Sequence, residues 1–492
     1  MKKSTTASYI LELEVVFTPS QRREVEARRE VARVIYNTCL GRVMKRWRSV
    51  QGNPKWRTAL RRVQEINAIG DPSPDEMKER TALRKEMREV EKDFGLTEYE
   101  LHAFVKEVNV HFDRRISINE AQVTATRAFR TFEKYRYGHC KKVRFLPKGA
   151  EVTVENKSNN FGLRVVGQEL AWKDLRAPLV VKKGDRYAED AFLDRTKYVR
   201  LLSRTIRGRR RYFVQIVKEG KPPRKNRTVG SADSAVGIDI GPSAVAYYST
   251  GEKKAAIEPL APNACCEELD RKVGRLQRCM ARSLEANNPD AKDENGRWKK
   301  GVKLNKSKRW EKNRVKLANL KRRLAVNRRQ DHEKAANRII ALGTDVRVED
   351  TPITSWTKRA KETTVRKKDG KINRKKRFGK SVANHAPGLL LNCIARKLGN
   401  VGKELKRVKS SKVKASQRNH VDGSCRKKEL SERWFEVDGR RVQRDLYSSW
   451  LIAHVMENGE EIDLIACQDD WPNFLRAQAE ALAKAPKNLG IL

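Results

Sequence analysis

Residues 234–248 read SAVGIDIGPSAVAYY, and this stretch carries the clearest fold signal in the chain. Aliphatic side chains at 236, 238 and 240 alternate with Gly237, Asp239 and Gly241. The alternation predicts a strand that buries its aliphatic side chains on one face and turns Asp239 to the other. Because the chain has 109 Lys and Arg against 62 Asp and Glu, this carboxylate faces either a basic side chain or a metal ion.

The overall composition indicates a multidomain, strongly basic protein. With 492 residues, the chain is long enough for about three domains. Charged residues make up 35% of the sequence, above the roughly 25% of an average globular protein, and the formal net charge is +47. Such an excess repels itself unless a polyanion neutralises it. Because the basic residues are spread along the chain without an apolar anchor, we expect nucleic acid as a partner and no membrane.

Targeting signals are absent from the sequence as it stands. No run approaches the roughly 18 apolar residues of a membrane span, and Glu12 and Glu14 interrupt the region where a signal peptide needs an apolar stretch. These features predict a cytoplasmic protein. The eight cysteines include no C-x-x-C pair, so reduced, structural thiols are expected.

The first half of the chain predicts one strand, a helical region and a small barrel. Residues 9–17, YILELEVVF, alternate as a half-buried strand, and TPSQ at 18–21 has the residues of a capping box with Pro19 in the first turn. Charge-rich helical sequence continues to about Arg136. From 137 to 225, short β-rich runs separated by Gly, Asn and Lys are typical of a small antiparallel barrel, which the first strand completes most economically.

The second half predicts further strands and two very basic segments. Strand candidates at 244–249, 254–260 and 344–353 flank a largely helical region that ends near Leu342, and a second basic segment, 358–380, carries twelve Lys and Arg. Residues 306–329 hold eleven basic residues and one acid around an apolar stripe. This segment is either a solvated basic helix or, as we favour, a helix that follows a phosphate backbone. We predict nucleic-acid contacts by Arg309, Trp310, Lys312, Lys316, Arg322 and Arg323.

Three carboxylates stand at positions that suit a metal-dependent nuclease. Asp239 lies on a predicted strand, Glu349 ends another, and Asp445 begins a helix with an apolar stripe. Taken singly, each has an ordinary interpretation: Asp239 pairs with a lysine, Glu349 with the basic surroundings of Arg347, and Asp445 caps its helix. Taken together, they supply the hard oxygen ligands with which two Mg²⁺ ions stabilise the attacking and leaving oxygens of a phosphodiester. The glycines beside Asp239 are expected to let a nucleic-acid backbone approach the strand.

The same residues carry a resemblance to a known family. GIDIG with Asp239, RVED with Glu349 and RD with Asp445 resemble the three segments of a split, RNase H-like RuvC nuclease domain. The order of strand, helices, barrel and RuvC-like half resembles the TnpB transposon nucleases and the miniature type V CRISPR effectors. The resemblance implies RNA-guided cleavage of DNA in a prokaryotic cell, with guide RNA and target double-stranded DNA as partners and a monomer or homodimer around one RNA. It also implies that the three carboxylates are catalytic residues that bind two Mg²⁺ ions.

The resemblance gives this α+β chain a domain order. Residues 1–18 are the first strand of a wedge barrel, 19–136 an inserted helical recognition domain, and 137–225 the rest of the wedge barrel. Residues 226–415 are RuvC-like segments I and II with the basic helix, and 441–492 are segment III with an acidic tail. Between them, 416–440 is a degenerate zinc ribbon that contacts target nucleic acid.

The ribbon departs from the family pattern at every zinc position. It keeps Ser416 and Gln417, for which we predict nucleic-acid contact. The four positions that are cysteines in the family are here Asn419, Asp422, Phe435 and Asp438. No zinc is therefore expected, because these side chains are poor ligands for a tetrahedral zinc site. The acidic residues between 457 and 470 have no counterpart in the family pattern.

These observations leave three functions open. The leading one is an RNA-guided, Mg²⁺-dependent DNA endonuclease in which guide pairing supplies sequence specificity. The first alternative is an RNA-guided DNA-binding protein that silences without cutting, against which the intact acidic triad argues. The second is a guide-free, RuvC-like structure-selective nuclease, against which the net charge and the large non-catalytic half argue.

Overall fold

The chain forms two compact units that each combine helices with a β-sheet. The computed structural model describes residues 6–223, 229–263, 267–294, 296–357, 379–429 and 432–486. One unit spans Met1–Lys225 and the other Asn226–Leu492. The protein is therefore a multidomain α+β protein, as the sequence predicts, and each unit is described by itself.

The first unit contains a seven-stranded antiparallel sheet in the order β2-β6-β7-β1-β5-β4-β3. Its strands are β1 (Ser8–Val15), β2 (Val154–Glu155), β3 (Leu163–Val166), β4 (Glu169–Trp172), β5 (Leu175–Val180), β6 (Thr196–Ile206) and β7 (Arg209–Glu219). The sheet curls until β3 contacts β6, so the barrel is nearly closed. The first strand of the chain lies in the middle of this sheet, between β7 and β5, although about 140 residues separate it from β2.

Alternation places the two faces of β1 as the sequence predicts. Leu11 and Leu13 point into the barrel core, whereas Glu12 and Glu14 lie on the outer face. Glu12 pairs with Arg204 of β6, and Glu14 pairs with Arg211 of the adjacent strand β7. The hairpin of β3 and β4 and the short helix α6 (Arg186–Leu193) were not predicted from the sequence.

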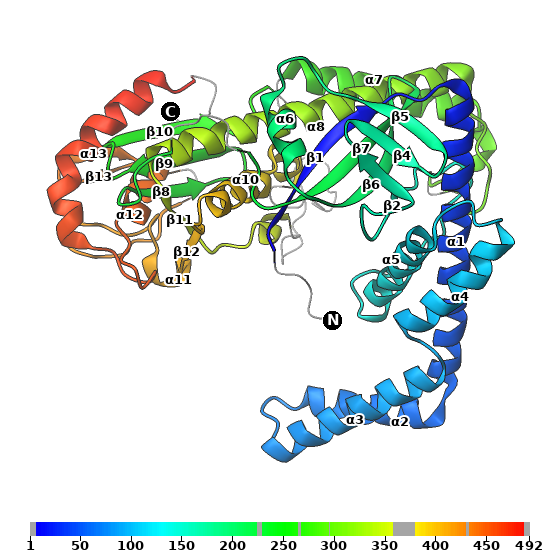
Figure 1. Cartoon of the computed structure of the whole chain (residues 1–492). Helices are drawn as coiled ribbons and strands as arrows, with labels where there is room; N and C mark the ends of the chain where they lie inside the picture. The colour runs from blue at the N-terminus through cyan, green and yellow to red at the C-terminus, as the bar shows by residue number, and fades with distance from the viewer. Residues whose placement is uncertain are drawn as a thin grey trace. The chain divides into compact units, whose positions relative to one another are not determined.

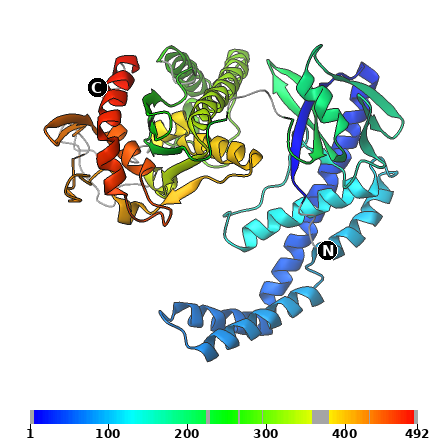
Figure 2. The same cartoon turned by 60° about the vertical axis from the view of Figure 1, so that its left-hand side comes forward.

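Five helices follow β1 before the barrel resumes. They are α1 (Pro19–Gly52), α2 (Pro54–Ala68), α3 (Pro74–Asp93), α4 (Glu98–His111) and α5 (Ile118–Arg136). The predicted capping box forms at the start of α1, with reciprocal bonds between Thr18 and Gln21. Helices α2 and α3 pack on each other as a hairpin beyond the far end of α1, as both cartoon views show (Figures 1 and 2).

A buried carboxylate fixes α5 against the barrel. Glu120 closes a capping box with Ser117 and also accepts hydrogen bonds from the Leu163 backbone N–H at 2.7 Å and from Trp172 Nε1 at 3.0 Å. Burial raises the pKa of Glu120, and these donors oppose that rise. The helices and the barrel are therefore joined by specific polar contacts as well as by a shared apolar core.

The second unit is built on a five-stranded mixed sheet in the order β10-β9-β8-β11-β12. Its strands are β8 (Ala235–Ile240), β9 (Ala244–Ser249), β10 (Lys254–Pro259), β11 (Asp345–Glu349) and β12 (Lys406–Val408). Strands β8, β9 and β10 pair antiparallel, whereas β11 pairs parallel with both β8 and β12. The strand predicted from GIDIG is thus the central one.

Helices cover both faces of this sheet. One face packs on α8 (Lys308–Leu342) and α10 (Pro387–Asn400), and the other on α12 (Arg444–Ala453) and α13 (Leu464–Lys484). The unit also contains α7 (Glu267–Ala286), which packs along α8, the short helices α9 (Gly379–His385) and α11 (Ser410–Val413), and the hairpin of β13 (Trp434–Val437) and β14 (Arg440–Gln443).

Gly237, two residues before Asp239, allows a helix to pack closely on β8. This corrects the prediction that the glycine lets a nucleic-acid backbone approach the strand. A Cβ on Gly237 would lie 2.0 Å from the carbonyl oxygen of Ser449 and 2.3 Å from the backbone nitrogen of Ala453. Helix α12 therefore occupies the space that we had assigned to a nucleic-acid backbone. A Cβ on Gly241 would meet only the Ala244 carbonyl, at 3.4 Å.

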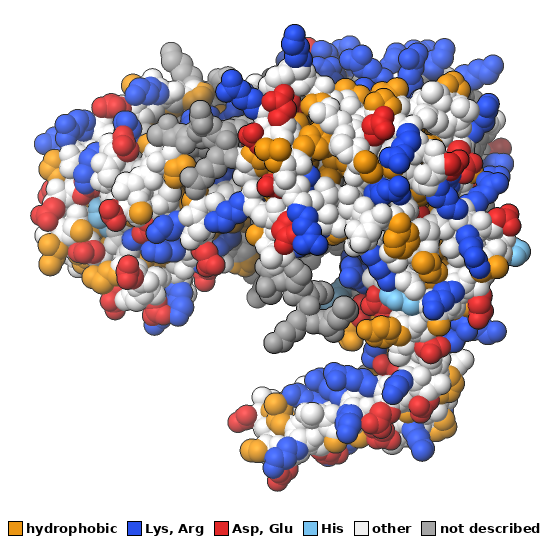
Figure 3. Space-filling model, in the orientation of Figure 1, with side chains coloured by type: hydrophobic (Ala, Val, Ile, Leu, Met, Phe, Trp, Pro, Cys, Tyr) orange, Lys and Arg blue, Asp and Glu red, His pale blue; other side chains and the backbone are white. Residues whose placement is uncertain are grey.

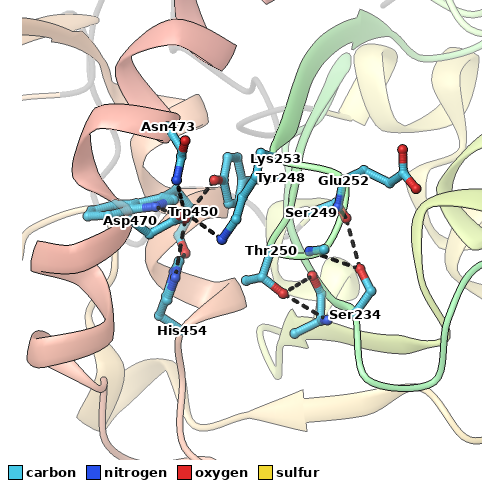
Figure 4. Close-up of polar contacts among 12 residues, drawn as sticks. Ser234, Tyr248, Ser249, Thr250, Glu252, Lys253, Trp450, His454, Asp470 and Asn473 are labelled. Carbon is cyan, nitrogen blue, oxygen red and sulfur yellow. Dashed lines mark hydrogen bonds and ion pairs between the residues drawn. The ribbon is translucent and has the colours of Figure 1, made fainter.

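The acidic segment near the C-terminus is also different from the expected tail. Residues from Leu464 form α13, and Asp470 of that helix is buried among donors (Figure 4). Its carboxylate accepts hydrogen bonds from Tyr248 Oη at 2.6 Å, from Lys253 Nζ at 2.7 Å and from Trp450 Nε1 at 3.1 Å. Burial alone would raise the pKa of Asp470, but the hydrogen bonds from Lys253 and Tyr248 help to lower it below its ordinary value. The carboxylate thus joins α13 to the sheet and to α12.

Two sequence features remain to be placed. The second basic segment, 358–380, lies outside the described residues except for its last two positions. None of the described helices combines the length and hydropathy needed to cross a membrane.

Candidate functional site

Strand register brings Asp239 and Glu349 side by side. Strands β8 and β11 run parallel with Arg347 opposite Gly237 and Val348 opposite Ile238, so the next pair in this register is Glu349 with Asp239. Adjacent strands lie about 4.8 Å apart, and residues in register on them point to the same face of the sheet. Val346 and Val348 are buried on the opposite face. The two carboxylates are therefore neighbours on the face that α12 covers.

Helix α12 brings the third carboxylate to the same end of the sheet. Gly237 contacts Ser449 and Ala453, and Asp445 lies one turn before Ser449. From Ser449 back to Asp445 is about one helical turn, or about 5.4 Å along the helix. From Gly237 to Asp239 is two strand residues, or about 6.6 Å along β8. Because these distances are similar, Asp445 lies beside Asp239. Ser448, the residue before Ser449, lies close enough to Asp239 for its side chain to lower the pKa of that carboxyl, against the larger effects that raise it.

The charges of Asp445 and Glu349 act on Asp239. The pKa of Asp239 is raised well above its ordinary value, first because the side chain is desolvated and then because Asp445 and Glu349 are close. Burial also raises the pKa of Glu349, with a further contribution from Asp350. Two half-buried carboxylates with raised pKa values are sites where a cation would be strongly stabilised.

The contacts of Asp239, Glu349 and Asp445 do not match the alternatives of an ion pair for the first two and a helix cap for the third. Among the described residues, neither Asp239 nor Glu349 forms an ion pair with a Lys or Arg. Arg347 instead binds Asp345 at 2.5 Å and the Ala453 carbonyl at 3.0 Å. The N-cap of α12 is Gln443, whose side chain accepts the Leu446 N–H at 2.8 Å.

Asp445 has partners that the sequence analysis missed. Arg433 Nη1 lies 3.3 Å from its Oδ2 and Arg444 Nε lies 3.4 Å from its Oδ1, and Gln443 Nε2 donates at 3.5 Å. Arg444 was visible in the sequence as the neighbour of Asp445. Arg433 was not recognisable, because it is brought near by the β13–β14 hairpin, where the Arg444 N–H bonds to the Arg433 carbonyl.

The three carboxylates are suitable ligands for a divalent metal such as Mg²⁺, although in this structure they are not close enough together to hold one ion. Carboxylate oxygens are the ligands that Mg²⁺ prefers, and it keeps several waters when it binds to few of them. Among the described residues, no three His, Cys, Asp or Glu side chains are gathered tightly enough to hold one metal ion. Asp445 contacts Arg433 and Arg444, whereas among the described residues Asp239 and Glu349 form no ion pair. The nearby charge of Arg444 still lowers the pKa of Asp239, against the larger effects that raise it.

The predicted nucleic-acid contacts on α8 form a solvent-facing basic surface. Arg309, Lys312, Lys316 and Arg323 are exposed, and within the described chain their side chains form no ion pair. Figure 3 shows Lys and Arg side chains in a row along its top edge, where Figure 1 draws α7 and α8. Trp310 and Arg322 are half-buried. Lys306 Nζ lies 4.9 Å from the ring centroid of Trp310, and Arg322 donates to Asn319 at 3.2 Å.

Residues 416–440, predicted to be a degenerate zinc ribbon, include β13 and the turn of the β13–β14 hairpin, and the four predicted ligand positions have other contacts. Asn419 Oδ1 accepts the Val421 N–H and Asp422 Oδ1 accepts the Ser424 N–H, so both side chains shape a turn. Phe435 packs on Tyr447, and Asp438 occupies the left-handed turn position between β13 and β14 with φ of 50°. Ser416 and Gln417 lie in the turn after α11, where the Gln417 carbonyl accepts the Arg426 N–H.

Comparisons with known proteins found similarity only among solved structures. No family model and no curated protein matches the sequence. The chain is similar to a Cas12f1–sgRNA–target DNA complex, with 10% identity and a TM-score of 0.40 over 91% of this chain and 98% of that one. It is also similar to a CRISPR–Cas12f ternary complex, with 12% identity and a TM-score of 0.29 over 88% and 82% of the two chains.

Proposed function

We propose that this protein is an RNA-guided DNA endonuclease whose catalytic residues are Asp239, Glu349 and Asp445. The observation that carries the proposal is that two strands and one helix bring three carboxylates toward the same end of the sheet. The register of β8 with β11, continued by one residue, supports a pairing of Asp239 with Glu349, and the packing of α12 on Gly237 supports the approach of Asp445. The sheet of the second unit has three antiparallel strands extended by two parallel ones, and we assign it to the RNase H-like RuvC domain.

Each carboxylate has a defined task in this proposal. Asp239 and Glu349 would hold the divalent cation, and Asp445 would be available as a further ligand where a substrate phosphate takes its place on Arg433 and Arg444. Bound Mg²⁺ supplies positive charge to the attacking and leaving oxygens of the scissile phosphodiester. The backbone N–H groups in the first turn of α12 favour negative charge at the same place.

The charge of the rest of the molecule favours the binding of a large nucleic acid. The net charge of +47 and the unpaired basic surface of α8 suit a bound guide RNA and the heteroduplex it forms with target DNA. We assign the barrel to the wedge and α1–α5 to recognition, and we place the protein in the cytoplasm of a prokaryotic cell as a monomer or homodimer on one RNA.

Substitution of Asp239 by Asn is the first test. Cleavage of target DNA in Mg²⁺ should fall at least about a hundredfold, the usual cost of removing a group that stabilises the transition state. Guide and target binding, measured with chelator present, should stay within twofold or so of wild type. Asp233→Asn, an exposed acid before the same strand, is the control. Cleavage by the Asp239 variant at the wild-type rate would refute the assignment.

A second matched pair separates the two acids of the RVED motif. Glu349→Gln should abolish cleavage, because this side chain faces Asp239. Asp350→Asn should retain most of it, since the Asp350 carboxylate is exposed and binds the Ser410 N–H at 3.1 Å and Oγ at 2.7 Å. If Asp350→Asn were the inactive variant, the register-based assignment would be wrong.

One observation favours the non-cutting alternative enough to keep it. The contacts of Asp445 with Arg433 and Arg444 already neutralise one of the three carboxylates. If these pairs persisted on the bound target, the protein would bind DNA and silence it without cutting. Wild-type protein with guide RNA, target DNA and Mg²⁺ would then give a stable complex and no cleaved product.

A further inference from the structure

A cavity of about 500 Å³ lies in the first unit, far in sequence from the acidic site. One wall is the stripe of α5 formed by Val123, Thr126, Arg127 and Arg130, whose spacing of three and four residues puts them on one side of the helix. The other wall is the edge of β2 and the outer face of β6 and β7, with Glu155, Arg200 and Leu202. Cavities of this size accommodate small organic groups.

The charged side chains of this cavity are held in place before any ligand binds. Glu155 Oε2 accepts a hydrogen bond from Arg127 and another from Arg200, both at 2.6 Å. Arg127 also donates to the Thr153 carbonyl at 2.6 Å, and Arg200 donates to Tyr198 Oη at 2.9 Å. One carboxylate therefore fixes two guanidinium groups beside each other and neutralises only one of them.

A third arginine adds charge without a protein partner. Arg130 lines the same cavity and is exposed, and its side chain makes no hydrogen bond or ion pair with any described residue. Three guanidinium groups and one carboxylate leave an excess of two positive charges. Val123 and Leu202 supply apolar surface beside them.

We propose that this cavity binds one nucleotide of a nucleic-acid strand, with its phosphate on Arg130 and Arg200 and its sugar or base against Val123 and Leu202. Guanidinium groups match phosphate oxygens in geometry and charge, and fixed ones lose less entropy when they bind. The inference rests on the proposed function only in taking a nucleic acid as the partner. The strand can be RNA or DNA, which share this chemistry.

The test measures binding of the full-length protein to fluorescent oligonucleotides of one sequence, prepared as single-stranded RNA, single-stranded DNA and duplex DNA. Anisotropy titrations over a salt series contain chelator, so no cleavage is needed. Arg130→Gln and Arg200→Gln should each weaken binding of one probe about tenfold. Each should also reduce the slope of log K against log salt by about 0.7 for a single strand or about 0.9 for a duplex.

Two further variants separate the cavity from general electrostatics and from misfolding. Arg84→Gln removes the same charge from an exposed, unpaired arginine of α3. It should change the affinity and the salt slope less than Arg130→Gln or Arg200→Gln does. Val123→Phe fills the cavity without changing charge, and it should weaken binding of the same probe while circular dichroism and melting stay at wild-type values.

The outcomes assign the source of the strand or overturn the site. A loss confined to RNA identifies a guide nucleotide, and a loss confined to a DNA probe identifies a target nucleotide. Equal effects of Arg130→Gln and Arg84→Gln, or wild-type binding by Val123→Phe, would overturn the proposal. Because cleavage is not measured, failure here is distinct from an active Asp239→Asn variant, which would instead refute the nuclease assignment.

Discussion

At the scale of single residues, the acidic site carries an electrostatic cost in the metal-free protein. Asp239 is desolvated and lies near two further carboxylates, and its pKa is raised well above the ordinary value. A group whose folded-state pKa is raised contributes stability that is present below its ordinary pKa and is lost as pH rises through the folded value. At neutral pH without metal, the ionised form of Asp239 therefore opposes folding.

This cost predicts a variant that is inactive but more stable. In chelator at neutral pH, Asp239→Asn should raise the melting temperature by about 2–4 °C, the change that about 1 kcal/mol produces in a unit of this size. The difference from wild type should shrink as pH falls through about 4 and vanish below about 3, since Asp239 is then protonated in both states. Calorimetry over a pH series checks this. A lower melting temperature at neutral pH would mean that the carboxylate has a stabilising partner.

Sequence reasoning named the acids of the candidate site but not Arg433, which lies beside Asp445. The alternation of β8 and β11 was enough to predict that Asp239 and Glu349 point away from the aliphatic face. Arg433 could not be assigned in the same way, because it approaches Asp445 only through pairing of the β13–β14 hairpin. Side-chain periodicity reports which face a residue occupies, whereas contacts between distant segments depend on register.

At the scale of elements, the site depends on how closely α12 approaches β8. The helix backbone contacts the strand at Gly237, and Arg347 donates to the carbonyls of Ala453 and Val455 at the C-terminal end of the helix. These contacts fix the position of α12 along the strand. The N-terminal turn, which carries Asp445, is placed by the same contacts.

A pair of glycine variants tests this placement. Gly237→Ala should destabilise the protein by several kcal/mol or displace α12, because the new methyl group overlaps backbone atoms that cannot move alone. Cleavage should fall with it. Gly241→Ala, in the same GIDIG motif, should change stability by less than about 1 kcal/mol, since its Cβ contact of 3.4 Å is nearly normal. Chemical denaturation of both variants measures the difference, and equal stabilities would contradict close helix packing at Gly237.

Prediction of elements from sequence succeeded where patterns were regular and local. The capping box of α1 and the alternation of β1 marked their positions closely. Strand β6 was missed, because its outward face alternates large basic and apolar side chains, such as Arg200 and Leu202, instead of uniformly polar ones. The insertion of β1 between β5 and β7 involves residues more than 150 positions apart, so the order of the sheet was not available from local patterns.

At the scale of the whole molecule, charge is the dominant property. The formal net charge of +47 is spread over both units, and many carboxylates are already paired with arginines, as Glu12 and Glu14 are. The remaining basic side chains repel one another unless an anionic partner is bound. Any ligand that binds only the folded state raises its stability by mass action. A bound RNA should therefore increase the melting temperature, and added salt should reduce that increase.

The basic surface of α8 gives the most direct test of this charge. Replacing Arg309, Lys312 and Lys316 together by Gln should reduce the slope of log K against log salt by about 2–3 units if each contacts a phosphate. The helix itself should remain folded, because all three side chains are exposed and form no ion pair with described residues. The matched control removes three exposed charges from α3, at Arg84, Lys85 and Arg88.

The comparison of the two triple variants separates a phosphate-binding helix from a general effect of net charge. Loss of general charge would change both slopes equally, because each variant lowers the net charge by three. A larger change for the α8 variant would mean that phosphates lie along this helix in the complex, since counterions are released only where charges meet. An unchanged slope for the α8 variant would make Arg309, Lys312 and Lys316 an ordinary solvated face. RNA binding would then have to depend on other parts of the chain, among them the arginines of the α5 cavity.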